Sequence, residues 1–331
     1  MTVHGVASSA VGVIIAVTIL LGAATIAIIL RFLARRRTDS TGIDDWAALS
    51  AYLFLIAVSV CHYLILSPYG SAGHPQSEFD AQQLKQYLII LYADNICYTC
   101  CTITVKLSIL LLLRRIFTSR SFQIIAYTLT GIFVVWWITV LFFQIFSCYP
   151  VHSFWDFEVR QSCIDTTKFY NGVAISNILM DFILLALPLP MIWKLQMTLR
   201  KKLQVSFIFI LGGFTLICSI LRTESLRKLD VNNQTETIVA VGIWTIIECG
   251  IGVICSCLPP TARLFRVLSE KMRSTVRSQK QHDDINLLNV GESGTPRLGL
   301  PSDGSYSVIN EDGLDLKRHG EQKISVNSWT R

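Results

Sequence analysis

The chain has 331 residues, of which 52% are hydrophobic and only 16% charged, and its mean hydropathy is +0.49. That balance lies far from the usual composition of soluble domains. The formal net charge is +6, but the basic residues lie between apolar runs, so nucleic acid is excluded as an expected partner.

Seven apolar runs follow one another, each long enough to cross about 30 Å of hydrocarbon as a helix. The sequence therefore predicts an all-α, polytopic bundle of seven transmembrane helices in a lipid bilayer. The membrane domain is expected over residues 11–268. Its spans are predicted at about 11–33, 46–66, 84–113, 122–147, 169–193, 203–221 and 238–258.

The first ten residues contain no lysine or arginine, so they lack the basic start of a cleaved signal peptide. We interpret 1–10 as a short lumenal tail. The first span ends in a cluster of arginines, Arg31, Arg35, Arg36 and Arg37, which is predicted to stop at the membrane face. Asp44 and Asp45 follow, where the next helix begins and its dipole favours carboxylates.

The third and fifth spans carry polar residues at membrane depth. The third contains Asp94, Asn95 and Lys106. Lys106 lies 12 residues, or about 18 Å, beyond Asp94, which is too far to neutralise it. We expect Lys106 to extend toward the cytosolic face or to pair near Asp44 and Asp45. In the fifth span, Pro188 follows Asp181 and is expected to kink the helix and widen a cavity there.

Basic residues are distributed unevenly between the two sides. The loops after spans one, three and five, together with 263–280, hold 17 Lys and Arg, whereas the opposite side holds six. The positive-inside rule then places the N-terminus outside or in the lumen and the C-terminus in the cytosol. The last 63 residues, 269–331, are rich in Gly, Ser, Asp and Lys and are predicted to be a disordered cytosolic tail. The membrane itself is either the endoplasmic reticulum or the plasma membrane.

Two features fit an oxidising outer side. Cys148 and Cys163 lie in one predicted lumenal loop and are expected to form a disulfide, worth about 3 kcal/mol in the chain-entropy model. Asn233 begins an Asn-Gln-Thr glycosylation sequon on the same side.

The candidate site consists of three acids, Asp94, Asp181 and Glu248. Each lies about 10 or 11 residues, roughly 15 Å, from the outer end of its span, so we expect one layer of carboxyls. Desolvation and mutual repulsion should keep at least one protonated near neutrality, and a neutral acid in an apolar cavity is a potential general acid. The same groups could instead be polar contacts between helices. Asn95, Asn177 and Trp244 are the candidate substrate-binding residues.

Other chemistry is not indicated. Cys255 and Cys257 lack accompanying histidines, so no metal site is predicted. His62 and His74 lie singly near the outer face. The seventh span contains no lysine, which argues against a retinal Schiff base, and no cofactor is expected.

Five ordered blocks resemble the fungal rhodopsin-like integral membrane family, which includes satratoxin-cluster membrane proteins. They are Gly42–Trp46, Lys106–Phe117, Cys148–Cys163, Asp181–Leu195 and Ile247–Pro259. The resemblance covers about residues 11–268. It implies a seven-helix bundle of a filamentous fungus, frequently encoded beside genes of secondary metabolism.

The resemblance implies more than one function. The leading hypothesis is a membrane-bound meroterpenoid cyclase, in which one of the three acids protonates a lipophilic isoprenoid substrate. One alternative is a receptor-like sensor of hydrophobic compounds that engages a G protein at its cytosolic face. Another is a non-catalytic scaffold for pathway enzymes.

Overall fold

A computed structural model describes residues 8–36, 41–66, 80–156, 162–190, 199–228 and 238–261. The predictions for Asn233 and for the tail 269–331 lie outside these residues. Within them, seven helices are long and apolar enough to cross a membrane, which confirms the predicted all-α, seven-span fold. Which end faces the cytosol stays a prediction.

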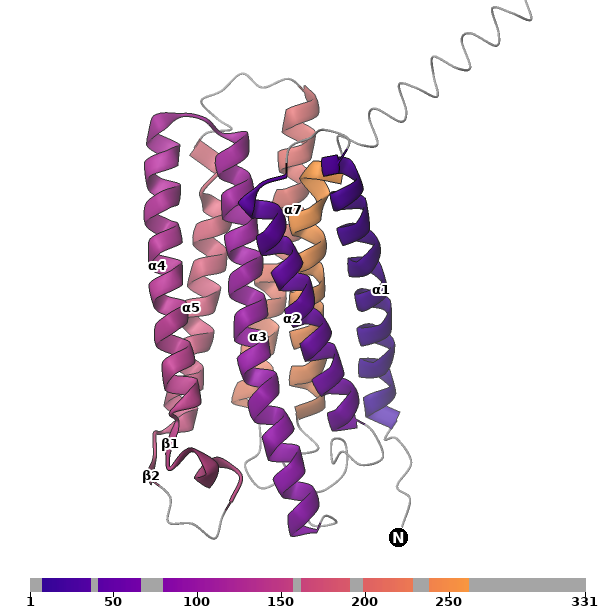
Figure 1. Ribbon diagram of the computed structural model, residues 1–331, viewed down its shortest axis with the longest axis vertical. Coiled ribbons are helices and arrows are strands. Elements are labelled where there is room, and N and C mark those ends of the chain that lie inside the picture. The colour runs from indigo at the N-terminus through magenta and orange to yellow at the C-terminus, as the bar shows by residue number, and fades with distance from the viewer. Residues whose placement is uncertain are drawn as a thin grey trace, which may run out of the picture. The chain divides into compact units, whose positions relative to one another are not determined.

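The helices lie side by side as a bundle (Figure 1). They are α1 (Ser8–Arg36), α2 (Ile43–Leu66), α3 (Ala81–Ile116), α4 (Arg120–Ile145), α5 (Thr166–Ala186), α7 (Leu199–Arg227) and the helix Ile238–Thr261. Most bounds fall within a few residues of the predicted spans. The fifth and sixth spans differ most.

Helix α5 ends at Ala186, where the sequence predicted a helix continuing to residue 193. Pro188 explains the interruption, because it has no N–H to donate to the Leu184 carbonyl one turn earlier, whereas Leu187 before it keeps helical geometry. The N–H of Leu187 closes the helix on the carbonyl of Ile183. Residues 189–190 are helical again, so Pro188 interrupts the predicted span, and residues 191–193 lie outside the described part of the chain.

Helix α7 continues to Arg227, six residues beyond its predicted end. Arg222 was assigned to the outer loop because a charge usually ends an apolar run. It lies instead inside the bundle, where it is 7% exposed. The side with more basic residues stays the same when Arg222 is removed from the count.

Helix α3 is the most buried of the spans in the described part of the chain. Its 36 residues correspond to about 54 Å, so it is longer than the hydrocarbon layer. Asp80 and Gln83 form a capping box at its start. It contributes to both apolar cores, one with α1, α2 and Ile238–Thr261 and one with α4 and α5.

Large apolar side chains remain exposed on the outside of the bundle. On α1 and α4 they include Ile15, Ile19, Val135, Ile138 and Phe142, each more than half exposed. Water would not favour such a surface, whereas lipid chains would. The surface agrees with a bilayer environment.

One end of the bundle carries a small hairpin, and we call it the hairpin end. Strands β1 (Cys148–Tyr149) and β2 (Ser162–Cys163) pair antiparallel, with the 3-10 helix η2 (Val151–Phe154) between them. Cys148 and Cys163 lie opposite each other and form the predicted disulfide. The ring of Tyr92 on α3 packs against Phe154 at 5.3 Å between centroids, which fixes the hairpin to the bundle.

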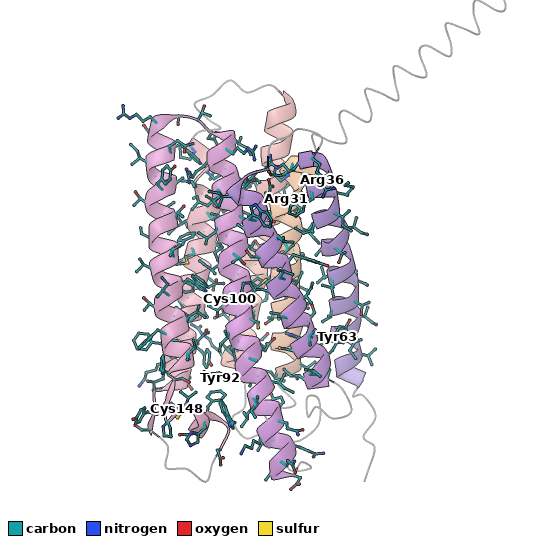
Figure 2. The ribbon with its side chains drawn as sticks, viewed as in Figure 1. Arg31, Arg36, Tyr63, Tyr92, Cys100 and Cys148 are labelled. Carbon is teal, nitrogen blue, oxygen red and sulfur yellow. A yellow bond between two sulfur atoms is a disulfide. The ribbon has the colours of Figure 1, made fainter. Side chains whose placement is uncertain are left out.

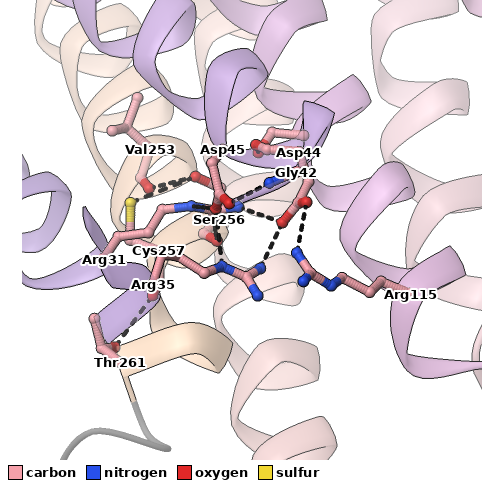
Figure 3. Close-up of polar contacts among 11 residues, drawn as sticks. Arg31, Arg35, Gly42, Asp44, Asp45, Arg115, Val253, Ser256, Cys257 and Thr261 are labelled. Carbon is pink, nitrogen blue, oxygen red and sulfur yellow. Dashed lines mark hydrogen bonds and ion pairs between the residues drawn. The ribbon is translucent and has the colours of Figure 1, made fainter. Parts of the chain in front are cut away.

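The opposite end carries buried arginines, and we call it the arginine end; Figure 2 shows Arg31 there, far from Cys148. Arg31 is fully buried, although the sequence predicted a stop at the membrane face. Its guanidinium contacts Asp44 and Asp45 at 2.7 Å each and donates to the Ser256 carbonyl (Figure 3). The acids begin α2 as predicted, but their main partners are arginines.

Two further arginines complete this cluster. Arg35 lies 2.6 Å from Asp44 and 3.0 Å from Asp45, and Arg115 lies 3.3 Å from Asp44. Helices α1, α2, α3 and Ile238–Thr261 are therefore joined at the arginine end by one ionic cluster.

Candidate functional site

Two of the three predicted acids meet in the middle of the bundle. Asp181 on α5 and Glu248 on Ile238–Thr261 both lie within hydrogen-bond distance of the Ser219 hydroxyl, at 3.0 and 2.9 Å. Ser219 is fully buried. Since one hydroxyl has one hydrogen, it donates to only one carboxylate at a time. The expected proximity of the acids is therefore observed for this pair.

Glu248 is surrounded by donors. Its Oε1 accepts from Tyr98 Oη at 3.1 Å and from Asn177 Nδ2 at 3.0 Å, and its Oε2 accepts from Arg222 Nε at 3.0 Å. The Arg222 guanidinium also stacks over the Tyr98 ring, 4.5 Å from its centroid. An acceptor-only role for both oxygens fits an ionised carboxylate. Glu248 therefore has the surroundings of a stabilised anion.

Asp181 also has a cationic partner. Lys106 Nζ on α3 forms an ion pair with Asp181 Oδ1, and both side chains are about nine-tenths buried. The prediction that Lys106 extends to the cytosolic face or pairs near Asp44 and Asp45 is wrong. The sequence does not show how far α5 is shifted along α3. In the structure this shift brings Asp181 to the depth that the Lys106 side chain reaches.

Asp94 has different surroundings. Its Oδ1 lies 3.3 Å from His62 Nδ1 on α2, but that nitrogen is already hydrogen-bonded to the Val58 carbonyl at 2.9 Å. Asp94 Oδ1 is consequently buried without a hydrogen-bond partner among the described residues. The histidine that the sequence left single is thus the ionic neighbour of a predicted site residue.

A large cavity of about 640 Å³ opens at the hairpin end. Its volume falls within the range of pockets that hold drug-sized ligands. Polar residues from six helices line it, including His62, Asp94, Asn95, Tyr98, Gln144, Asn171, Arg222 and Thr245. Most of the remaining lining is apolar. We call it the hairpin-end cavity.

A smaller cavity of about 60 Å³, the inner cavity, lies nearer the arginine end and is lined by Lys106, Asp181, Glu248 and Pro188. It has room for a few water molecules only. Tyr98 and Arg222 line the hairpin-end cavity and contact Glu248, which lines the inner one. We call Tyr98, Lys106, Asp181, Arg222 and Glu248, together with Asn177 and Ser219, the ionic network. It connects the two cavities.

The three candidate binding residues have different positions. Asn95 lines the hairpin-end cavity, with its amide bonded to the Leu91 carbonyl at 2.9 Å. Asn177 belongs to the ionic network through Glu248. Trp244 is half-buried and lines neither cavity, while its neighbour Thr245 faces the hairpin-end cavity.

Sequence reasoning missed the three basic partners, His62, Lys106 and Arg222. A usable signal existed for Arg222, because Ser219, Arg222 and Thr223 continue the spacing of one helix face past the predicted end of the span. For His62 and Lys106 only the packing of α2, α3 and α5 reveals the partner.

Comparison with known proteins adds the family. The fungal rhodopsin domain matches residues 30–267. The chain belongs to the fungal rhodopsin family. A relative described as a SAT4 family membrane protein, from Emericella nidulans, is 31% identical over 259 residues, which are 74% of this chain and 64% of that protein. This fungal rhodopsin family member therefore spans less than two thirds of that relative's length.

Two other relatives show how varied the family's descriptions are. The polyenoic acids biosynthesis gene cluster protein Ba17b of Metarhizium anisopliae is 27% identical, over 90% of this chain and 86% of its own. Receptor GIN3 of Arthrobotrys oligospora is 25% identical, over 71% of this chain and 57% of its own. No solved structure matches the chain.

The family name raises the question of retinal, and the residues do not fit it. The helix Ile238–Thr261 contains no lysine for a Schiff base. Lys106 is held by Asp181 and faces the inner cavity, whose 60 Å³ cannot admit a polyene.

Proposed function

We propose that this protein is a receptor-like membrane sensor. A small lipophilic molecule binds in the hairpin-end cavity. The ionic network then transmits the resulting conformational change toward the arginine end. The carrying observation is that Tyr98 and Arg222 line this cavity and also hold Glu248. A ligand that contacts Tyr98 or Arg222 would strengthen or weaken the buried ion pair between Arg222 and Glu248.

The energetics of the network support a signalling role. Burying charges is expensive, and well-packed apolar residues often stabilise a core at least as well as a buried ion pair does. Charged residues inside a membrane bundle therefore favour a functional explanation. The receptor among the relatives supports the same proposal.

The proposal assigns the hairpin end to the oxidising outer side, because the disulfide lies there. The arginine end then faces the cytosol, where a G protein or pathway enzymes would bind. An internal ionic cluster that joins four helices is suited to such an end, since its repacking would move several helices together.

A co-purification experiment tests the sensor. Membranes that contain the full chain are incubated with an organic extract of the producing culture, and the proteins that co-purify are identified. We expect the extract to change the yield of a G protein subunit severalfold for the wild type. Ala174→Phe, which places a bulky ring at a position that lines the hairpin-end cavity, should abolish the change.

The matched control is Ile175→Phe, because Ile175 is 54% exposed on the same helix and faces away from the core. It should respond to the extract as the wild type does. An extract-dependent change that Ala174→Phe leaves intact would place the sensing event elsewhere.

Acid catalysis remains a second candidate because of Asp94. Asp181 and Glu248 are held by cations, so Asp94 is the acid that faces the large cavity with an oxygen lacking a hydrogen-bond donor. In a terpene cyclase it would protonate an olefin or epoxide of a farnesyl-bearing substrate. Microsomes assayed with a farnesylated phenol should then lose turnover with Asp94→Asn.

Asp80→Asn is the control for this assay, since Asp80 is an exposed cap of the same helix and asparagine caps equally well. Turnover that survives Asp94→Asn would end the catalytic candidate.

A further inference from the structure

The hairpin-end cavity contains buried oxygens that lack hydrogen-bond donors among the described residues. They are Asp94 Oδ1, Gln144 Oε1 and Asn171 Oδ1, and all three residues line the cavity. Asp94 is 9% exposed and Gln144 5%. Buried polar atoms are nearly always satisfied, because each unsatisfied group lowers stability. A cavity with three such oxygens requires an occupant that supplies the missing donors.

The orientation of the Gln144 amide follows from its neighbour. The Thr99 hydroxyl donates to the Asn95 carbonyl at 3.0 Å, so it can only accept from Gln144, whose Nε2 lies 2.9 Å away. The amide must therefore present its NH2 to Thr99 and its oxygen away from it. Gln144 consequently offers the cavity an acceptor, as Asp94 does.

Charge selects among possible donors. An ammonium group would find Asp94 but also the Arg222 guanidinium, which lines the same cavity. A carboxylate ligand could pair with Arg222, but the Asp94 carboxyl and two amide oxygens would repel it. A neutral hydroxyl can donate to any one of the three oxygens, and it brings no charge of its own into a low-dielectric site.

Volume and lining define the rest of the ligand. About 640 Å³ is available, and apolar side chains such as Leu88, Leu91, Ala174 and Val239 form much of the wall. We propose that the cavity binds a neutral lipophilic molecule carrying two or more hydroxyl groups, each of which donates to one of the oxygens of Asp94, Gln144 and Asn171. This inference rests on the proposed function, because it names the ligand class of the same cavity.

The test compares four probes of one chain length: 1,2-dodecanediol, its dimethyl ether, dodecylamine and dodecanoic acid. The full chain is placed in phosphatidylcholine nanodiscs, and affinity is obtained from the ligand-dependent shift of the unfolding temperature. We expect the diol to bind at least about 10-fold more tightly than the diether. Equal affinity of diol and diether, or a preference for the amine or the acid, would overturn the inference and leave water as the donor.

Two variants assign the contacts. Gln144→Leu and Asn171→Leu should each weaken diol binding by about 10-fold and leave diether binding unchanged. Asn171 is only half-buried, so its variant keeps the test valid if Gln144→Leu does not fold. Unchanged diol affinity in a folded variant contradicts that contact.

Two further comparisons distinguish failure of the ligand class from failure of the proposed function, and a lipid ligand from a diffusible one. Probe binding that Ala174→Phe abolishes, but that shows no hydroxyl preference, overturns only the ligand class. If no probe gives a shift sensitive to Ala174→Phe, the cavity is not the ligand site and the proposed function fails with it. Competition by monoolein, a diol that resides in the bilayer, would assign the natural ligand to lipid, and its absence would assign it to a diffusible metabolite.

Discussion

Glu248→Gln is expected to lower the free energy of unfolding by about 3–5 kcal/mol, the usual loss when one partner of a buried ion pair is removed. The substitution keeps the shape of the side chain and an oxygen for Tyr98 and Asn177. It removes the negative charge that Arg222 requires, and Arg222 is only 7% exposed. Thermal unfolding in nanodiscs measures the loss, expected as roughly 10 °C.

The matched control is Glu224→Gln on α7, because Glu224 pairs with Lys228 at 3.3 Å in an exposed position. Its loss should stay within about 0.5 kcal/mol. Adding Arg222→Gln to Glu248→Gln should restore part of the stability, since no uncompensated charge then remains. Wild-type stability of Glu248→Gln would contradict the described network.

Arg31→Gln is expected to cost about 3 kcal/mol of stability, the lower part of the range for broken buried ion pairs. Arg31 is fully buried and contacts both Asp44 and Asp45. The loss is kept near the lower limit because Arg35 stays within reach of both acids. Denaturation of the purified protein measures it.

Arg36→Gln provides the comparison, since Arg36 is exposed near the end of the same helix. It should change the free energy of unfolding by no more than about 0.5 kcal/mol. If the two variants were equally stable, the cluster at the arginine end would not hold the helices together.

The bundle itself could be predicted from the sequence because apolar runs of membrane length leave few alternatives. The disulfide followed from two cysteines in one loop, and the family followed from five ordered blocks; the structure and the family match confirm both. The errors in α5 and α7 came from single residues. Pro188 interrupts a span that the apolar run predicts as continuous, and Arg222 lies inside a helix that its charge predicts to have ended.

The candidate site was harder to predict, for a physical reason. Composition and depth identify a buried acid, but its partner depends on how neighbouring helices are rotated and shifted against each other. Asp181 and Glu248 were expected to be close, and they are. Their cations, Lys106 and Arg222, were assigned to the membrane face and the outer loop because an isolated helix would place them there.

These partners change the functional hypothesis. The sequence favoured a cyclase because unpaired acids in an apolar site would hold protons. Asp181 and Glu248 are in ion pairs with Lys106 and Arg222, and Asp94 lies 3.3 Å from His62, so none of the three acids is without a basic neighbour. A ligand-binding cavity connected to a buried ionic network is then the simpler explanation for the presence of Asp94, Asp181 and Glu248 inside the bundle.

The central claim, that a small lipophilic molecule occupies the hairpin-end cavity, is tested most directly by mass spectrometry of what co-purifies. The wild type, Ala174→Phe and Ile175→Phe are purified in nanodiscs from the producing fungus, and their organic extracts are compared. We predict a hydroxylated compound enriched with the wild type and Ile175→Phe and absent from Ala174→Phe. Identical extracts from all three proteins would contradict the claim.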